Sequence, residues 1–347
     1  MRLKCFSNLA GADFDRFLTS FSKLQEGVRQ APYRTGLLPF PVWIGFICQP
    51  TKFAKEFWIV EDDLGRALGR IGANVSATKA DEGAIGFFEC DLTTPAGIEA
   101  GGKLLEAAES WLKAKGVKTA YGPMNFNTWF PYRFRTSQNI DKQDLFFGWE
   151  PVNPPEYVDI WKSAGYETCE LYATKAHGEL DAFAAKTKPA YDGALAAGYT
   201  FRTVEPIQFL EKDVPVLYEI SSQGFKDNFL FEPIPFEVFR ALYVPIAGKS
   251  DLSLSHIAFD KDGKGVGFFF CYEDQGHLVL KSTAVVPQAR GKGISNAVAY
   301  LAAEKALKKG VNKYITALVK TGAQSESFAK KGSLLWEHEY TLFSKLL

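Results

Sequence analysis

Apolar and polar positions follow the same succession in two separate parts of the chain. In the first part, three short segments alternate as strands do, at residues 57–60, 70–76 and 84–90. A helical period follows and ends at Gly116, and the residues up to Gly122 resume a strand pattern. The predicted order is therefore three strands, a helix and a strand.

The second part repeats this order. Its strand-like segments are residues 256–260, 266–272 and 278–286, and its helix ends at Gly310 before another strand begins. The segments that join helix to strand, 108–122 and 303–317, are also similar in sequence. Each part closes with a short helix and a final strand, at 157–165 and 166–175 in the first and at 325–332 and 336–345 in the second. This internal repeat predicts two domains of one α/β (α+β) fold with a mixed sheet.

The boundary between the repeats is predicted near residues 176–198, an alanine-rich helical stretch that ends at Gly198. Residues 199–204 have the pattern of a first strand, and 214–225 and 235–243 that of paired helices. We therefore expect one domain over residues 1–177 and a second over 178–347.

A glycine-containing loop joins the third strand of the second domain to its helix. Residues 288–295 read Gln-Ala-Arg-Gly-Lys-Gly-Ile-Ser, and apolar residues recur at helical spacing from Ile294 onward. The free N–H groups of a helix start attract an anion, and glycine lets the backbone approach it closely. A phosphate-bearing cofactor is therefore expected at this loop.

The loop resembles the signature of the GNAT superfamily of N-acetyltransferases, Gln/Arg-x-x-Gly-x-Gly/Ala, through Gln288, Gly291 and Gly293. It lacks the third glycine of a dinucleotide-binding loop and the Gly-Lys-Ser/Thr of a Walker loop. The resemblance implies two tandem GNAT domains, acetyl-CoA as the cofactor and transfer of its acetyl group to a primary amine.

The same resemblance implies where the cofactor lies. The strand backbone at Ala284, Val285 and Val286 would pair with the pantetheine arm and offer an N–H group to the developing oxyanion. The residues implied for the pyrophosphate are Gln288, Arg290, Gly291, Lys292, Gly293, Ile294 and Ser295.

The residues for proton transfer are less well defined. Some GNAT enzymes carry a glutamate eleven residues before the signature, a position held here by His277, and Glu273 is a second candidate base. His277 also fits a plain turn histidine beside Gly276. The tyrosine that many members use as an acid is replaced by Phe328.

The usual asparagine of the family falls on Thr321, a second departure. The acid is then Tyr340 or Tyr314, or the thiolate leaves without assistance.

Composition limits the partners. The chain has 347 residues, with 40 Lys and Arg against 40 Asp and Glu, so no overall field favours nucleic acid or an anionic membrane. No signal peptide or membrane-spanning stretch is seen, and a cytoplasmic protein is expected. The 5 cysteines and 4 histidines show no metal-ligand spacing, so no metal is expected. The oligomeric state is not predicted.

The first domain departs from the family at the corresponding loop. Residues 91–101 carry Asp91 and Glu99 and no basic side chain, so the loop should bind pyrophosphate poorly. This domain is expected to be a degenerate GNAT unit that serves structure or substrate recognition. Residues 125–135 are rich in aromatic side chains that either cover a core or line an acceptor pocket, where Arg133 or Arg135 would bind a carboxylate.

An acetyl-CoA-dependent N-acetyltransferase acting on a small-molecule or peptide amine is the favoured function. The first alternative is a non-catalytic acyl-CoA-binding regulatory protein, which the replacement by Phe328 favours. The second is a tRNA-dependent aminoacyl transferase of tandem-GNAT type, against which the balanced charge argues.

Overall fold

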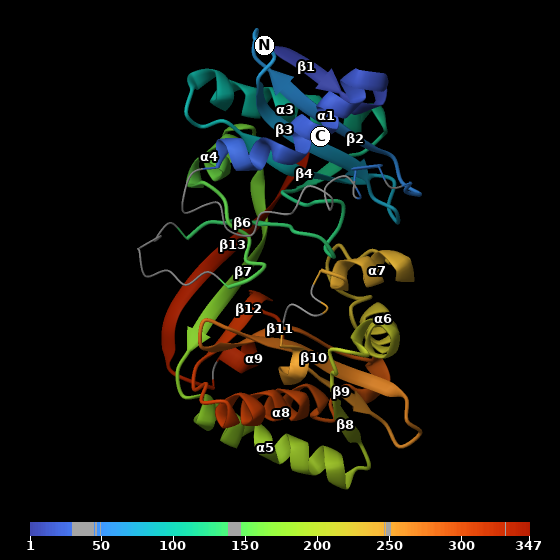
Figure 1. Ribbon diagram of the computed structural model, residues 1–347, viewed down its shortest axis with the longest axis vertical. Coiled ribbons are helices and arrows are strands. Elements are labelled where there is room, and N and C mark those ends of the chain that lie inside the picture. The colour runs from blue at the N-terminus through green and yellow to red at the C-terminus, as the bar shows by residue number, and fades with distance from the viewer. Residues whose placement is uncertain are drawn as a thin grey trace. The chain divides into compact units, whose positions relative to one another are not determined.

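The computed structural model describes residues 1–29, 45, 47–48, 50–137, 147–245, 247, 251–329 and 331–347 (Figure 1). The chain forms two compact units. Unit 1 comprises Met1–Leu171 and Glu339–Leu347, and unit 2 comprises Tyr172–His338. The chain therefore passes from one unit to the other twice, and the last nine residues belong with the first half of the sequence.

Unit 1 is built on a mixed sheet with strand order β1-β2-β3-β4-β5-β13, and β6 also pairs with β13. All contacts in this sheet are antiparallel except β4 beside β5. Its strands are β1(Arg2–Cys5), β2(Lys55–Glu61), β3(Ala67–Val75), β4(Glu82–Cys90), β5(Thr119–Gly122) and β6(Phe134–Arg135). Its helices are α1(Gly11–Val28), α3(Pro95–Ala114) and α4(Pro155–Ser163).

Helices cover both faces of this sheet. Phe57 and Trp58 are neighbours in β2, so their side chains point to opposite faces. The Phe57 ring lies 5.4 Å from that of Phe21 in α1, and the Trp58 ring lies 6.0 Å from that of Trp111 in α3. Both strand residues are buried. The core of unit 1 therefore has an α1 side and an α3 side.

Unit 2 has the strand order β7-β12-β11-β10-β9-β8. Its strands are β7(Glu167–His177), β8(Thr200–Thr203), β9(His256–Phe259), β10(Gly265–Asp274), β11(His277–Val285) and β12(Tyr314–Lys320), with β13(Leu334–Leu346) leading back to unit 1. Its helices are α5(Leu180–Ala196), α6(Val214–Gly224), α7(Phe236–Tyr243), α8(Ile294–Lys308) and α9(Glu326–Ala329). Helix α8 packs on the sheet, and α5 packs on α8 (Figure 1).

The final strands of the two repeats are exchanged. Strand β7 closes the first repeat in sequence, yet its residues Tyr172 to His177 pair with β12 of unit 2. Strand β13 closes the second repeat, yet its residues from Phe343 onward pair with β5 of unit 1. Each unit is therefore completed by a strand from the other repeat.

The predicted fold class, a mixed α/β fold with tandem repeats, is confirmed. The strands and helices expected from the sequence are present with small differences at their ends. Strand β1 and helix α1 were not predicted. The sequence does carry a signal for α1, because Phe17, Phe21 and Leu24 recur at helical spacing and are buried on one face.

Candidate active site

Strands β11 and β12 of unit 2 start side by side and then separate. Their parallel register covers only Leu278, Val279 and Leu280 of β11, although β11 continues to Val285 and β12 to Lys320. A bulge in the pairing with β10 lies just beyond Leu280. In the described part of the chain, the edge of β11 from Ser282 to Val285 therefore has no recorded pairing with β12. Such an edge can form strand-like hydrogen bonds with an extended amide-containing ligand.

The loop after β11 leads into a helix start without a side-chain cap. Gly291 and Gly293 have φ of +76° and +75°, a conformation that favours glycine. Gly293 is the N-cap of α8, and no side chain from the described residues caps the helix. The first N–H with a partner inside the helix is that of Ala297, which donates to Gly293 O at 2.9 Å. For Ile294, Ser295 and Asn296 no backbone N–H bond is recorded within the described residues, and such groups can hold an anion.

The two glycines have different surroundings. A Cβ added to Gly291 would meet nothing within 4 Å, whereas one added to Gly293 would lie 3.2 Å from the Cβ of Ala190 in α5. The backbone at Gly291 therefore borders open space, and α5 closes the loop on its other side. The sequence showed α5 as an alanine-rich helix but held no signal for its place beside the loop.

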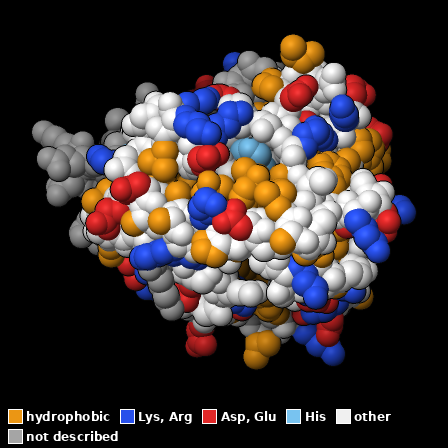
Figure 2. Space-filling model, turned by 90° about the horizontal axis from the view of Figure 1, so that it is seen from below, with side chains coloured by type: hydrophobic (Ala, Val, Ile, Leu, Met, Phe, Trp, Pro, Cys, Tyr) orange, Lys and Arg blue, Asp and Glu red, His pale blue; other side chains and the backbone are white. Residues whose placement is uncertain are grey.

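Basic side chains surround this helix start. Arg290 and Lys292 are exposed on the loop, and Lys331 Nζ donates to Asn296 Oδ1 at 3.1 Å on the first turn of α8. Burial and the neighbouring Lys186 lower the pKa of Lys331. Sequence reasoning missed Lys331, because its place beside α8 depends on the packing of α9. Figure 2 views unit 2 from the side of α5 and shows basic and acidic side chains interspersed over that face.

The candidate bases lie at the opposite end of β11 from the loop. His277 opens β11 and is buried, with Nδ1 2.9 Å from Gln275 O. Glu273 is exposed, and its Oε1 accepts from the N–H of Gly276 at 2.8 Å in the same hairpin turn. Because β11 has 9 residues, His277 lies roughly 26 Å along the strand from Val285. The structure thus brings the two candidates together but does not bring them to the loop.

The candidate acids are both buried. Tyr340 belongs to unit 1, where its hydroxyl donates to Glu150. Tyr314 opens β12 in unit 2, and its hydroxyl donates to the carbonyl of Phe328 at 3.3 Å. Burial raises the pKa of Tyr314, so its hydroxyl stays protonated at neutral pH. Phe328 is packed against the rings of Phe183 and Phe269 in the core of unit 2.

Unit 1 has a helix start at the equivalent place, and its own side chains cap it. Thr94 Oγ1 accepts from the N–H of Gly97 at 3.1 Å, and Asp91 Oδ1 accepts from the N–H of Thr93 at 2.9 Å. A Cβ on Gly97 would lie 1.8 Å from the carbonyl oxygen of Asp91. The loop is therefore folded tightly onto the first turn of α3.

The strand edge of unit 1 is also occupied. The parallel register of β4 with β5 ends at Ala84, as that of β11 with β12 ends at Leu280. Beyond it, the N–H of Met124 donates to Ile85 O at 2.8 Å, and the N–H of Phe87 donates to Asn125 Oδ1 at 2.6 Å. The chain itself makes the hydrogen bonds that an extended ligand would make here.

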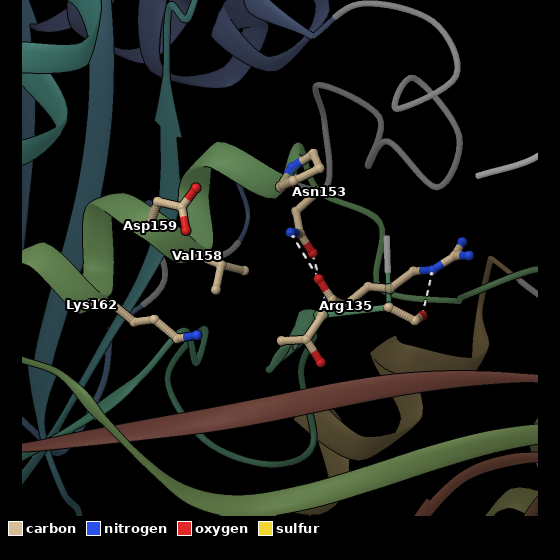
Figure 3. A pocket seen from close by; sticks show the side chains of 8 residues that line it. Arg135, Asn153, Val158, Asp159 and Lys162 are labelled. Atoms are coloured by element: carbon tan, nitrogen blue, oxygen red, sulfur yellow. Dashed lines mark hydrogen bonds between the residues drawn. The ribbon is translucent and has the colours of Figure 1, made fainter. Parts of the chain in front are cut away.

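The two arginines singled out in unit 1 have neighbours of their own. The Arg133 guanidinium lies 3.8 Å from the centre of the Tyr132 ring, and Arg135 Nη1 lies 3.9 Å from Glu150 Oε1. Arg135 also borders a cavity of about 80 Å³ beside Asp159 and Lys162 of α4 (Figure 3). The same view shows the hydrogen bond that Arg135 Nε donates to Ser137 Oγ at 3.3 Å. The cavity has room for a few water molecules only.

The described residues lack two further classes of site. Among the described residues, no three side chains of His, Cys, Asp or Glu gather as a metal ion would require. None of the described helices combines the length and apolar character needed to cross a bilayer.

The comparisons with known proteins agree with this geometry. The sequence profile of the Acetyltransferase (GNAT) family matches residues 215–332. Residues 215–332 are a GNAT domain. The matched range contains the separated strands, the uncapped start of α8 and helix α9. The predicted resemblance is thus confirmed for unit 2. The GNAT family uses acyl-CoA donors and small-molecule or peptide amine acceptors. No curated protein sequence matches the chain.

Solved structures extend the GNAT fold to the whole chain. A tandem GNAT protein from the clavulanic acid biosynthesis pathway, solved without acetyl-CoA, aligns with a TM-score of 0.55 and 14% identity over 99% of this chain and 98% of its own. A GCN5-related N-acetyltransferase from Sphaerobacter thermophilus aligns with a TM-score of 0.50 and 17% identity over 99% and 95%. At these identities the likeness is one of fold.

The glucosamine N-acetyltransferase region of a fungal multi-domain GH3 β-N-acetylglucosaminidase also aligns. Its TM-score is 0.57 at 12% identity, over 99% of this chain. The present chain spans only 38% of that larger protein.

Proposed function

We propose that the protein is an N-acetyltransferase that binds acetyl-CoA at unit 2 and transfers the acetyl group to an amine. The observation that carries the proposal is the combination of a helix start at Gly293 and a strand edge from Ser282 to Val285 that have, among the described residues, no side-chain cap and no pairing with β12, respectively. One is suited to a diphosphate and the other to an extended amide chain. Acetyl-CoA has both groups, joined in that order, and supplies the reactive thioester.

The residues of unit 2 would share the binding. The N–H groups of Gly291, Gly293, Ile294 and Ser295 would hold the diphosphate, with Lys292 and Arg290 adding positive charge. Gln288 would complete the loop, and the backbone of Ala284, Val285 and Val286 would pair with the pantetheine arm. One N–H on this edge would stabilise the oxyanion as the amine attacks.

Four side chains are proposed for proton transfer. His277 and Glu273 remain the proposed bases. His277 lies roughly 26 Å along β11 from Val285, which is farther than one bridging water can span, so the His277→Ala variant decides its role. Tyr340 and Tyr314 remain the proposed acids. Of the two, Tyr314 shares unit 2 with the loop; its raised pKa keeps the hydroxyl protonated and also makes it a weaker acid. The acceptor is a small-molecule or peptide amine, and a cytoplasmic location remains part of this proposal.

Unit 1 is proposed to be a degenerate GNAT domain with a structural or substrate-recognising role. The domain limits expected from the sequence, 1–177 and 178–347, follow the repeats, whereas the compact units follow the exchanged strands. The two descriptions differ only in the placement of β7 and β13.

Calorimetric titration with acetyl-CoA, followed by a screen of amines for CoA release, tests the proposal. We expect one binding site per chain and turnover with at least one class of amine. Binding of two equivalents would contradict the role given to unit 1, and no binding would refute the proposal. His277→Ala should lower turnover while leaving CoA affinity nearly unchanged, and full activity would remove His277 from the mechanism.

The second candidate function is a non-catalytic acyl-CoA-binding protein. It is favoured by Phe328, which has no hydroxyl at the position where many family members have their acid, and by the buried hydroxyl of Tyr340. Tight acetyl-CoA binding without turnover on any amine would establish it. A tRNA-dependent reaction is disfavoured by the balanced charge of the chain.

A further inference from the structure

Helix α6 ends directly against the strand edge proposed for the pantetheine arm. A Cβ added to its last residue, Gly224, would lie 2.9 Å from the Cβ of Ala284 and 3.3 Å from the carbonyl oxygen of Val285. Only glycine permits this approach without displacing the strand. The last residue of α6 is therefore packed directly against the end of β11 in unit 2.

Arg290 ties the phosphate loop to the same helix end. Its Nη2 donates to the carbonyl of Gly224 at 3.0 Å, and its Nη1 lies 3.5 Å from Asp227 Oδ2. The carbonyls at a helix end have no partner within the helix and carry partial negative charge, which favours a guanidinium there. The side chains of Arg290 and Asp227 are 47% and 63% exposed, so this ion pair is weak and can be exchanged.

The segment that follows, residues 225–234, leads from α6 to α7. At its start the Gly224 and Arg290 contacts fix it to β11 and the loop. Further along, Lys320 at the end of β12 places Nζ 5.3 Å from the centre of the Phe229 ring. The segment thus contacts the ends of both separated strands, β11 and β12. It lies across the opening between the strands, where an acceptor amine must approach the thioester.

We propose that Arg290 couples cofactor binding to the position of residues 225–231. This inference rests on the proposed function, because it takes the loop to bind the diphosphate of CoA. Arg290 precedes Gly291, whose backbone borders open space, so a bound diphosphate adds two negative charges beside the guanidinium. Charge-assisted bonds to phosphate are stronger than a bond to a neutral carbonyl and a 3.5 Å contact with an exposed carboxylate. Arg290 then leaves Gly224 and Asp227 for the phosphate.

The release has a direct consequence for the access of the acceptor. Without CoA, Arg290 holds residues 225–231 over the opening between β11 and β12. With CoA, the segment is freed at one end and the acceptor can enter. Arg290 is therefore a positioning residue for this segment.

Hydrogen-exchange mass spectrometry on the full chain, with and without saturating CoA, tests this coupling. The amides to follow are those of Asn228 and Phe231, which donate to Phe225 O at 2.9 Å and to Asn228 O at 3.1 Å. In the parent protein, CoA should speed their exchange roughly two- to fivefold, the range expected for loss of an exposed ion pair. Slower exchange at residues 291–296 in the same sample reports that CoA is bound.

Arg290→Ala and Lys292→Ala form a matched pair, since each removes one positive charge from the loop. Arg290→Ala should show the faster exchange at Asn228 and Phe231 without CoA, and CoA should add nothing further. Lys292 makes no hydrogen bond or ion pair with α6 among the described residues, so Lys292→Ala should bind CoA more weakly yet keep the full response at saturation.

Three outcomes would overturn the inference while leaving the proposed function in place. They are unchanged or slower exchange of residues 225–231 when CoA is bound to the parent, a normal CoA response in Arg290→Ala, and loss of the response in Lys292→Ala at saturation. Absence of CoA binding to the parent would instead refute the proposed function, and the inference with it.

Discussion

Helices α3 and α8 begin at the same place in the two repeats, but the N–H groups of their first turns are treated differently: in the described part of the chain, a side chain caps only those of α3. At α3, Thr94 caps the N–H of Gly97, and Asp91 folds back over the turn. At α8, Gly293 provides no side-chain cap, and the surrounding side chains are mostly basic. The same contrast holds for the strands beside them. Met124 and Asn125 form hydrogen bonds with the edge of β4, whereas among the described residues β11 has no strand pairing on the corresponding edge beyond Leu280.

If unit 1 is a degenerate GNAT domain, as proposed, this difference explains how it could lose a ligand site and remain stable. Unpaired backbone groups inside a protein are costly, so a site that no longer binds its ligand needs another partner for them. In unit 1 the chain supplies that partner with residues from the loop and from the segment after β5. Unit 2 keeps the groups open, which is the state that a ligand-binding site requires.

Gly291→Glu should have the largest effect, because it alters the open helix start of unit 2. A glutamate there places a negative charge at the proposed diphosphate site, and we expect CoA affinity to fall about 1,000-fold, or about 4 kcal/mol. Calorimetry measures this. Gly116→Glu is the matched control, because Gly116 in unit 1 has φ of +86° and also meets nothing within 4 Å. The control should bind CoA normally, and equal affinity in both variants would mean that the loop of α8 is not the site.

Gly86→Ala tests whether the chain itself fills the strand edge of unit 1. The added Cβ would lie 2.3 Å from the carbonyl oxygen of Met124, so the segment must move away. We expect the free energy of unfolding, from urea denaturation, to fall by about 2–4 kcal/mol. Gly102→Ala in α3, with open space around it, serves as the control. CoA affinity should stay at the parent value, and a large loss would show that unit 1 takes part in binding.

The exchanged strands give the units different responses to pH. His177 of β7 pairs with Tyr314 at the start of β12, and the two rings stack at 4.8 Å. Burial lowers the pKa of His177 from 6.5 to about 4. The unfolded chain therefore binds this proton first as the pH falls. Stability is complete above about pH 6.5 and declines toward pH 4.

In His177→Phe the stack with Tyr314 is retained and no proton can bind. The decline in the free energy of unfolding between pH 7 and pH 4 should shrink by about 1–3 kcal/mol. At the equivalent position of unit 1, Leu346 pairs with Thr119 and is 82% exposed. Leu346→His should add little pH dependence. Parallel pH curves for His177→Phe and the parent would contradict the assignment.

Thr94→Ala is the mildest change. It removes the side-chain cap of α3 and should lower the free energy of unfolding by about 1 kcal/mol. Thermal unfolding of the full chain measures the loss, and Thr94→Ser, which keeps the hydroxyl, should restore most of it. CoA affinity should be the same in all three proteins. A normal stability for Thr94→Ala would mean that the cap is not what closes the helix start.

The sequence was enough to predict those features that depend only on residues close together along the chain. The order of strands and helices, the repeat and the loop at residues 288–295 all follow from spacing and composition. The acidic loop at 91–101 predicted poor binding of pyrophosphate by unit 1, and this stays a prediction. In the structure, Asp91 and Thr94 hold the loop against the first turn of α3.

The remainder depends on contacts between distant residues. Nothing in the spacing of Met124 or Asn125 shows that they form hydrogen bonds with β4, and nothing near Tyr340 shows that its hydroxyl donates a hydrogen bond to Glu150. The candidate base at His277 was found by counting along one strand, and counting cannot show how far that residue lies from the loop. The distance from His277 to the loop follows from the extended conformation of β11 in the structure.

The exchange of β7 and β13 has a consequence for the newly made protein. Residues Glu339–Leu347 complete the sheet of unit 1, and the ribosome makes them after all of unit 2. An early domain usually folds while later ones are still being synthesised. Here the edge of β5 must wait, unpaired, until translation has passed residue 346. During that interval its free N–H and C=O groups can pair with a strand of another chain.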